Sequence, residues 1–315
     1  MGKIAWVFPG QGSQYLGMGR SIAEAEPKTK ALLDTAGKRL GYDLAELCWQ
    51  GPEVKLRQTQ YTQPALLTVS TMLAQVLRSR GLKPDVVAGH SLGEYSALVA
   101  CGSLEFEAGV TLVARRGQLM EEAVPDGQGA MAVLLGLDYS QVEAICQQAS
   151  QGEIVEPANL NCPGQIVISG ERRAVQRAMV LGKDRGARRV LELGVSGPFH
   201  SSLMRPAARV FVEDLAKIDL QDPEVPLAAN VTADYVQDAN AIRTVLVQQL
   251  YSPVRWEETI RRLLADGVQT FVEVGPGNVL AGLIKRVSRE VDIVGFQEME
   301  GLEKVLEMAK GDIVI

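Results

Sequence analysis

A serine between two glycines is the group in this sequence best suited to chemistry. Residues 89–93 read Gly-His-Ser-Leu-Gly, which fits the pattern G-x-S-x-G of a nucleophile elbow. In such an elbow the serine lies on a sharp turn between a strand and a helix, and residues 85–89 and 94–100 predict these two elements. We therefore expect Ser91 to act as a nucleophile. The turn would aim the backbone amide of Leu92 at the oxygen of an attacked carbonyl group.

A serine hydroxyl needs a base at neutral pH, and histidine is the usual one. The chain has only two histidines, His90 and His200. His90 directly precedes Ser91 on an extended segment, where successive side chains point to opposite faces. The sequence therefore predicts His200 as the base. Acidic residues downstream of His200 could still serve as its partner, but they would break the order Ser, Asp or Glu, His that α/β-hydrolases use, which disfavours an esterase.

The elements around these residues predict an α/β fold. A buried strand is expected at 3–8, and helices are expected at 64–80 and 103–123. From residue 130 to 193 the pattern changes to the order βαββαβ, which is ferredoxin-like. Beyond Gly194 helices and strands alternate again, with helices at 202–217 and 241–250 and strands at 225–230 and 270–274.

This order predicts a large α/β-hydrolase-like domain with a mainly parallel sheet, into which a small ferredoxin-like domain is inserted. The large domain would comprise residues 1–127 and 195–315, and the small domain residues 128–194.

Composition narrows the classes of function. A formal net charge of -6 disfavours a general nucleic-acid binder. Four scattered cysteines and two histidines offer no zinc pattern, so we expect reduced, mostly buried cysteines and no metal site. No run of about 18 uncharged apolar residues predicts a membrane span, and the first residues lack the apolar core of a signal peptide. A cytoplasmic location is the expectation.

Seven segments, in order along nearly the whole chain, resemble the malonyl-CoA:acyl carrier protein transacylase family of type II fatty acid synthesis. The segments are Phe8–Gln14, Gly89–Tyr95, Arg116 with Gly117 and Met120, Asn159–Gln165, Gly197–His200, Gln249–Tyr251 before Pro253-Val254, and Glu273–Gly277.

The resemblance implies roles for residues that pattern alone leaves unassigned. Gln11 matches the residue whose backbone amide joins that of Leu92 in the oxyanion hole, and Arg116 matches the arginine that binds the free malonyl carboxylate. A guanidinium suits this role because its fixed fork binds both carboxylate oxygens and keeps its charge. Gln249 matches the third triad position, where a neutral carbonyl group orients the histidine. Whether the side chain or the backbone of Gln249 supplies that carbonyl group is left open.

Four further residues fall at positions that line the acyl pocket in the family. Met120 lies four residues after Arg116, on the same helical face, although a plain core role is the alternative. Asn159 and Asn161 would line the site from the small domain, although asparagine is also common in turns. Phe199 resembles the pattern of malonyl-selecting members, because its ring could leave little room for an α-methyl branch.

The resemblance implies an acyltransferase that moves a malonyl group from malonyl-CoA to the phosphopantetheine thiol of acyl carrier protein through an ester on Ser91. No metal or redox cofactor is expected, and the chain is expected to act as a monomer. Three alternatives stay open: an acyltransferase serving a polyketide synthase, a thioesterase or esterase, and an inactive scaffold that only binds carrier proteins.

Overall fold

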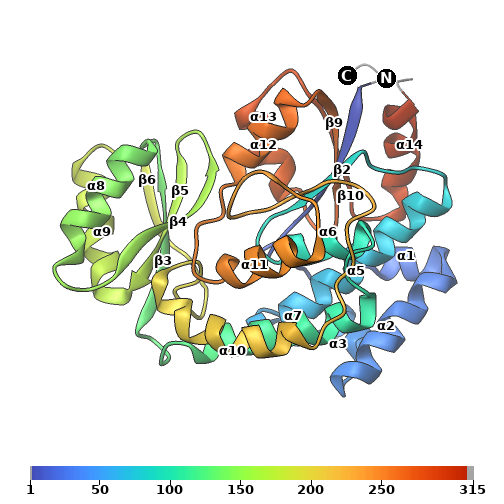
Figure 1. Cartoon of the computed structure of the whole chain (residues 1–315), viewed down its shortest axis with the longest axis horizontal. Helices are drawn as coiled ribbons and strands as arrows, with labels where there is room; N and C mark the ends of the chain where they lie inside the picture. The colour runs from blue at the N-terminus through green and yellow to red at the C-terminus, as the bar shows by residue number, and fades with distance from the viewer. Residues whose placement is uncertain (1, 311–315) are drawn as a thin grey trace.

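A six-stranded sheet forms the centre of the larger unit of this computed structural model, which describes residues 2–310 (Figure 1). Five strands are parallel, and β8 at one edge runs antiparallel to β7. In spatial order the strands are β10 (Asp292–Phe296), β9 (Val268–Val274), β1 (Lys3–Phe8), β2 (Val86–Gly89), β7 (Leu227–Ala228) and β8 (Tyr235–Val236). The predicted α/β fold with a mainly parallel sheet is confirmed.

Helices cover both faces of this sheet, because successive strand side chains alternate between two apolar cores. In β1, Trp6 and Phe8 face the larger core, whereas Ala5 and Val7 face a second core that includes residues of α12 and α13. The helices of the larger unit are α1 (Arg20–Ala25), α2 (Pro27–Leu40), α3 (Leu44–Gln50), α4 (Glu53–Leu56), α5 (Thr59–Ser79), α6 (Gly93–Ala100), α7 (Phe106–Glu122), α10 (Arg205–Ala216), α11 (Ala239–Gln249), α12 (Trp256–Ala265), α13 (Val279–Val287) and α14 (Leu302–Lys310), with short 3₁₀ turns η1 (Ser202–Met204) and η2 (Met299–Gly301).

The smaller unit is a four-stranded antiparallel sheet beside the larger one (Figure 1). Its strands lie in the order β4 (Val155–Cys162), β5 (Gln165–Glu171), β3 (Gly129–Leu135) and β6 (Arg189–Glu192). Helices α8 (Tyr139–Ser150) and α9 (Arg172–Asp184) pack on it around a core of their own. Along the chain these elements have the predicted order βαββαβ.

Backbone hydrogen bonds join the two units next to the segment that follows α11. Leu160 donates to the carbonyl oxygen of Val254 (2.9 Å), and Val254 donates to that of Ala158 (2.8 Å). Strand β4 is thereby held against the larger unit at the position from which Asn159 and Asn161 extend.

Several predicted boundaries differ from the structure. Helix α5 begins at Thr59, not at Pro64, which lies inside it. Helix α7 begins at Phe106 because the side chain of Glu105 caps it, accepting from the amide of Ala108. The expected helix 202–217 is a 3₁₀ turn followed by α10, and the expected strand 225–230 is only two residues long. Residue 1 and residues 311–315 of the predicted large domain lie outside the described residues.

Three further observations concern the chain as a whole. All four cysteines are free and buried, as predicted. Within residues 2–310 no three His, Cys, Asp or Glu side chains form a group that could hold a metal ion. No helix in that part of the chain is both long and apolar enough to cross a membrane.

Candidate active site

The turn between β2 and α6 has the geometry that its sequence predicts. Ser91 has φ 51°, in the left-handed region that residues other than glycine rarely adopt. A Cβ atom on Gly89 would lie 2.0 Å from the carbonyl oxygen of Gly93, and one on Gly93 would lie 2.0 Å from that of Phe8. Both positions therefore require glycine, and the tight turn places the serine hydroxyl at the start of α6.

Asn230, two residues after the neighbouring strand β7, fixes this turn. Its Oδ1 accepts from the amide of Ser91 (2.7 Å), and its Nδ2 donates to the carbonyl oxygen of Gly89 (2.6 Å). The side chain is buried, and it satisfies two backbone groups that the strained turn leaves without a partner in a helix or sheet. Asn230 was not predicted from the sequence. Its only signal was a polar residue at the end of an expected strand.

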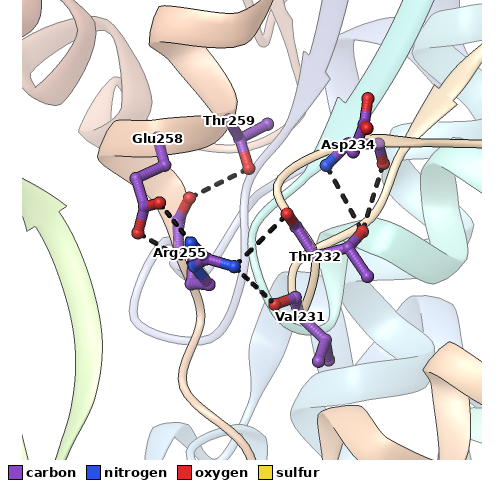
Figure 2. A network of polar contacts seen from close by, with 6 residues as sticks. All are labelled: Val231, Thr232, Asp234, Arg255, Glu258 and Thr259. Atoms are coloured by element: carbon purple, nitrogen blue, oxygen red, sulfur yellow. Dashed lines mark hydrogen bonds and ion pairs between the residues drawn. The ribbon is translucent and has the colours of Figure 1, made fainter.

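Arg255 anchors the segment that follows Asn230, as Figure 2 shows. The amide of Arg255 donates to the carbonyl oxygen of Asn230 (3.0 Å), and its guanidinium group donates to those of Val231 (3.5 Å) and Thr232 (3.4 Å). The same guanidinium group pairs with Glu258 in the first turn of α12. Through Arg255, Asn230 is thus linked to the first turn of helix α12.

His200 lies within hydrogen-bond distance of Ser91, as predicted. Its Nε2 is 2.7 Å from Ser91 Oγ, and its Nδ1 is 2.8 Å from the backbone carbonyl oxygen of Gln249. Because a carbonyl oxygen only accepts, Nδ1 carries the proton and Nε2 presents its lone pair to the serine hydroxyl. Burial, reinforced by the charge of Arg116, lowers the pKa of His200 to about 3. The imidazole is therefore neutral at pH 7 and oriented as a base.

His90, the other histidine, contacts Asn161 and Trp256. Its Nε2 lies 2.9 Å from Oδ1 of Asn161, and its ring packs edge-on against Trp256 with centroids 5.6 Å apart. Burial lowers its pKa.

Arg116 is fully buried beside the serine, on α7. Its Nη2 donates to Ser91 Oγ (3.3 Å) and to Oε1 of Gln249 (2.9 Å). Its Nε and Nη1 have no hydrogen-bond partner among the described residues. Burial lowers the pKa of the guanidinium group, but arginine keeps its charge in proteins. A buried cation with two free donors is suited to a ligand carboxylate.

A cavity of about 100 Å³ opens above Ser91 and brings together most of the predicted site residues. It is lined by Gln11, Gln63, His90, Ser91, Leu92, Arg116, Met120, Met131, Asn159, Leu193, Val195, Phe199 and His200. Gln249 is a predicted residue that does not line this cavity, but it bonds to two residues that do, Arg116 and His200. Asn161 instead lines an adjoining cavity of about 230 Å³, together with Gln11 and Asn159. Gln63, Met131, Leu193 and Val195 were not predicted, because nothing in their local sequence marks them.

Two backbone amides next to the serine are free to bind an oxyanion. Among residues 2–310 neither the amide of Gln11 nor that of Leu92 donates to a protein acceptor. The side chain of Gln11 donates from Nε2 to Oγ1 of Thr59 (3.2 Å). Both residues line the same cavity as Ser91.

Gln249 uses its two carbonyl groups for different partners, which answers the question that the sequence left open. The backbone carbonyl group orients His200, whereas the side-chain carbonyl group accepts from Arg116. The side-chain Nε2 donates to the backbone of Ser91 (3.0 Å) and to the carboxylate of Glu94. Glu94 was also missed, because an acidic residue in the first turn of a helix is usually solvated.

Comparison with known proteins places this site in a family. A family model described as an acyl transferase domain matches residues 5–309. The malonyl CoA-acyl carrier protein transacylase of Bacillus subtilis is 47% identical over 311 residues, which are 98% of each chain. The crystal structure of an acyl carrier protein S-malonyltransferase from Vibrio cholerae is 46% identical, with a TM-score of 0.94 over 96% of this chain and 99% of that one.

A further solved structure shows a malonyl-transacylase in complex with a type II PKS acyl-carrier protein. It is 46% identical, with a TM-score of 0.95 over 97% of this chain and 99% of that one. These matches place the chain among the acyl transferases. It belongs, within them, to the malonyl CoA-acyl carrier protein transacylase family.

Proposed function

We propose that this protein transfers the malonyl group of malonyl-CoA to the phosphopantetheine thiol of acyl carrier protein and so supplies the extender unit for fatty acid synthesis. The observation that carries the proposal is the placement of two groups around one hydroxyl. Ser91 Oγ lies 2.7 Å from the neutral nitrogen of His200 and 3.3 Å from the guanidinium group of Arg116. Relatives that match over nearly the whole chain bear the name of this activity.

In the first half-reaction His200 Nε2 takes the proton of Ser91 as Oγ attacks the thioester carbonyl carbon. The resulting oxyanion accepts hydrogen bonds from the amides of Gln11 and Leu92. The carbon–sulfur bond then breaks, and coenzyme A leaves with the proton from His200. The second half-reaction runs the same steps in reverse, with the phosphopantetheine thiol as the attacking group and Ser91 as the leaving group.

The malonyl carboxylate binds Arg116 along one edge of its guanidinium group, since each of the two edges has one unpaired donor atom, Nε or Nη1. Met120 and Phe199 form part of the wall of the acyl pocket, and Asn159 lines it from the smaller unit. Asn161, two residues further along strand β4, lines the adjoining cavity. Phe199 restricts the space beside the acyl group, and one methyl group is worth about 1 to 3 kcal/mol of discrimination. Selectivity for malonyl over methylmalonyl groups is therefore moderate.

His200 has a neutral partner where serine proteases have a carboxylate. The imidazolium ion is accordingly less stabilised, and the buried ring is a weak base with a pKa of about 3. A thiolate leaves more readily than an amine and needs less help from a general acid, so thioester exchange does not require the stabilised imidazolium ion that a carboxylate partner provides.

We also propose finer names for the architecture. The strand, elbow and helix around Ser91 support an α/β-hydrolase-like domain of residues 1–127 and 195–315. The order βαββαβ with an antiparallel sheet supports a ferredoxin-like domain of residues 128–194. The monomeric state and the cytoplasmic location remain predictions.

Intact-mass measurement after incubation with malonyl-CoA tests the function. Wild-type protein should gain one malonyl group and lose it to added acyl carrier protein, whereas the Ser91→Ala protein should gain none. Labelled Ser91→Ala protein would contradict the role of Ser91. Release of malonate to water without a carrier-bound product would indicate a thioesterase, and failure of every acyl-CoA to label the protein would indicate a scaffold.

An acyltransferase for a polyketide synthase is the second candidate. The relative solved with a type II PKS acyl-carrier protein is as similar to this chain as the malonyltransferase from Vibrio cholerae. Parallel transfer assays with carrier proteins from the two pathways distinguish the candidates. A higher kcat/KM for the fatty acid carrier supports the first.

A further inference from the structure

The proposed reaction assigns no role to the buried carboxylate of Glu94. Glu94 lies three residues after Ser91, in the first turn of α6, and is fully buried. Its Oε2 accepts from Nε2 of Gln249, and its Oε1 accepts from the amide of Asn230 (3.4 Å). Burying a carboxylate is costly unless it is paired or hydrogen-bonded. Its position therefore calls for a reason beyond helix formation.

Two acceptors determine which way the side-chain amide of Gln249 faces: the carboxylate of Glu94 and the carbonyl oxygen of Ser91 (3.0 Å). An ionised carboxylate only accepts, so it selects Nε2 of Gln249, and Oε1 must then point the other way. That oxygen accepts from Arg116 Nη2 at 2.9 Å. A reversed amide would set Nε2 against the guanidinium group, which also only donates. The amide orientation thus links Glu94 to Arg116.

The same chain of contacts balances charge in the buried site. Arg116 is a fully buried cation, and Glu94 lies near enough for each charge to favour the other's ionised form. Burial raises the pKa of Glu94 to about 7, against the bonds from Gln249 and Asn230 and the charge of Arg116, which lower it. Gln249 stands between the two charges as a polar bridge.

We propose that Glu94 is a positioning residue that sets selectivity for the malonyl group by holding Arg116 through the side chain of Gln249. The inference rests on the proposed malonyl transfer. Nη2 is tied beside Ser91 Oγ, which leaves Nε and Nη1 unpaired for the malonyl carboxylate. Without the Glu94 carboxylate, only the bond to the Ser91 carbonyl oxygen holds Nε2 of Gln249 in place, and Arg116 can leave the geometry that binds the malonyl carboxylate.

The effect should fall on acyl selectivity more than on proton transfer. His200 is oriented by the backbone of Gln249, and two hydrogen bonds from the side chain of Asn230 hold the Ser91 turn. The Gln249 side chain adds a single bond to this turn, from Nε2 to the carbonyl oxygen of Ser91 (3.0 Å), so a change in its orientation should affect acetyl loading less than malonyl loading. An acetyl group has no carboxylate for Arg116 to bind. Loading of acetyl-CoA therefore measures acyl transfer by Ser91 and His200 alone. Loading of malonyl-CoA measures the same transfer together with binding of the malonyl carboxylate by Arg116.

The test replaces Glu94 with Gln, which keeps the shape of the side chain but removes the charged acceptor, so that the Ser91 carbonyl oxygen alone selects Nε2 of Gln249. Steady-state loading is measured with malonyl-CoA and acetyl-CoA at pH 8, where Glu94 of the wild type is ionised. We expect the ratio of kcat/KM for malonyl-CoA to that for acetyl-CoA to fall about 10- to 100-fold, mainly through a higher KM for malonyl-CoA.

Glu273 offers a matched control. It is also fully buried, burial also raises its pKa to about 7, and its carboxylate accepts from the amides of Leu280 (3.0 Å) and Ala281 (2.8 Å) in α13. Glu273→Gln removes a buried charge of the same kind without touching Gln249. It should leave the malonyl-to-acetyl ratio within about threefold of the wild type, even if its Tm falls.

A second variant covers the case in which Glu94→Gln does not fold. Gln249→Ala removes the bridge and leaves Glu94 in place, so it should lower the same ratio. Where both fold, the double variant should lower the ratio no further than Gln249→Ala does, because the two residues act through one contact.

The outcomes separate this inference from the function on which it rests. Wild-type protein that fails to load malonyl groups would overturn the proposed function. If the wild type loads normally, an unchanged ratio in the Glu94→Gln protein overturns the positioning role and leaves the function standing. An equal loss with both substrates would mean that Glu94 supports only the fold, and this also overturns the inference.

Discussion

The imidazole of His200 donates from Nδ1 to the backbone carbonyl oxygen of Gln249, 2.8 Å away. The group that orients the base is therefore part of the main chain at the end of α11, and no side-chain substitution removes it directly. The side chain of Gln249 serves Arg116 and Glu94 instead. Orientation of the base and binding of the acyl carboxylate thus meet in one residue but use different atoms.

Gln249→Ala should separate these two roles. The backbone carbonyl group remains, so acetyl-CoA should still load Ser91 at a rate within about tenfold of the wild type. His200→Ala removes the base and should cost about 10² to 10⁴ with either substrate. Stopped-flow or quenched loading assays with acetyl-CoA compare the two variants. Equal losses would mean that the side chain of Gln249, not its backbone, orients the histidine.

Arg116→Ala should shift the acyl preference towards uncharged groups. The variant loses charge-assisted bonds to the malonyl carboxylate, so kcat/KM for malonyl-CoA should fall about 10² to 10³ relative to that for acetyl-CoA. Arg115 provides the control, since its Nε pairs with Asp214 at 3.0 Å on another side of α7. Arg115→Ala should keep the malonyl preference. An unchanged preference in Arg116→Ala would contradict the carboxylate grip.

Sequence could predict the parts of the site that short segments encode. The turn at Ser91 is specified by Gly89 and Gly93, whose added Cβ atoms would each lie 2.0 Å from a backbone oxygen. His200 followed by elimination, because the chain has only two histidines. Arg116 came from the resemblance alone, and its burial and its two free donors could not have been read from the helix pattern.

The missed residues act across long separations in the chain. Asn230 bonds to a turn 139 residues earlier, and Gln249 bonds to a carboxylate 155 residues earlier. A polar residue that will be buried has the same sequence pattern as one that will be solvated, so the sequence could not single out Asn230 or Glu94. The segment 20–56 was also left unassigned. The structure folds it into four helices.

The pH dependence of loading should lack a step at the ordinary pKa of histidine. Because the pKa of His200 is lowered to about 3, the free enzyme keeps a neutral base as the pH falls from 7 to 5. The value of kcat/KM reports ionisations of the free enzyme, so with acetyl-CoA it should stay within about twofold across this range. Glu94, with a pKa of about 7, also titrates there, and the Glu94→Gln protein measured in parallel removes that contribution. A tenfold loss centred near pH 6.5 in both proteins would show that His200 titrates normally.

Asn230→Ala should destabilise the protein as well as slow it. The substitution leaves the amide of Ser91 and the carbonyl group of Gly89 without their partner, and each unsatisfied buried group costs about 1 to 3 kcal/mol. The free energy of unfolding should therefore fall by about 2 to 4 kcal/mol, which thermal melting detects as a lower Tm. Asn240, exposed near the start of α11, is the matched control, and its replacement by Ala should change the free energy of unfolding by no more than about 0.5 kcal/mol. Equal melting of the two variants would mean that the turn at Ser91 holds its strained backbone without Asn230, and that the glycines at 89 and 93 are sufficient to keep it.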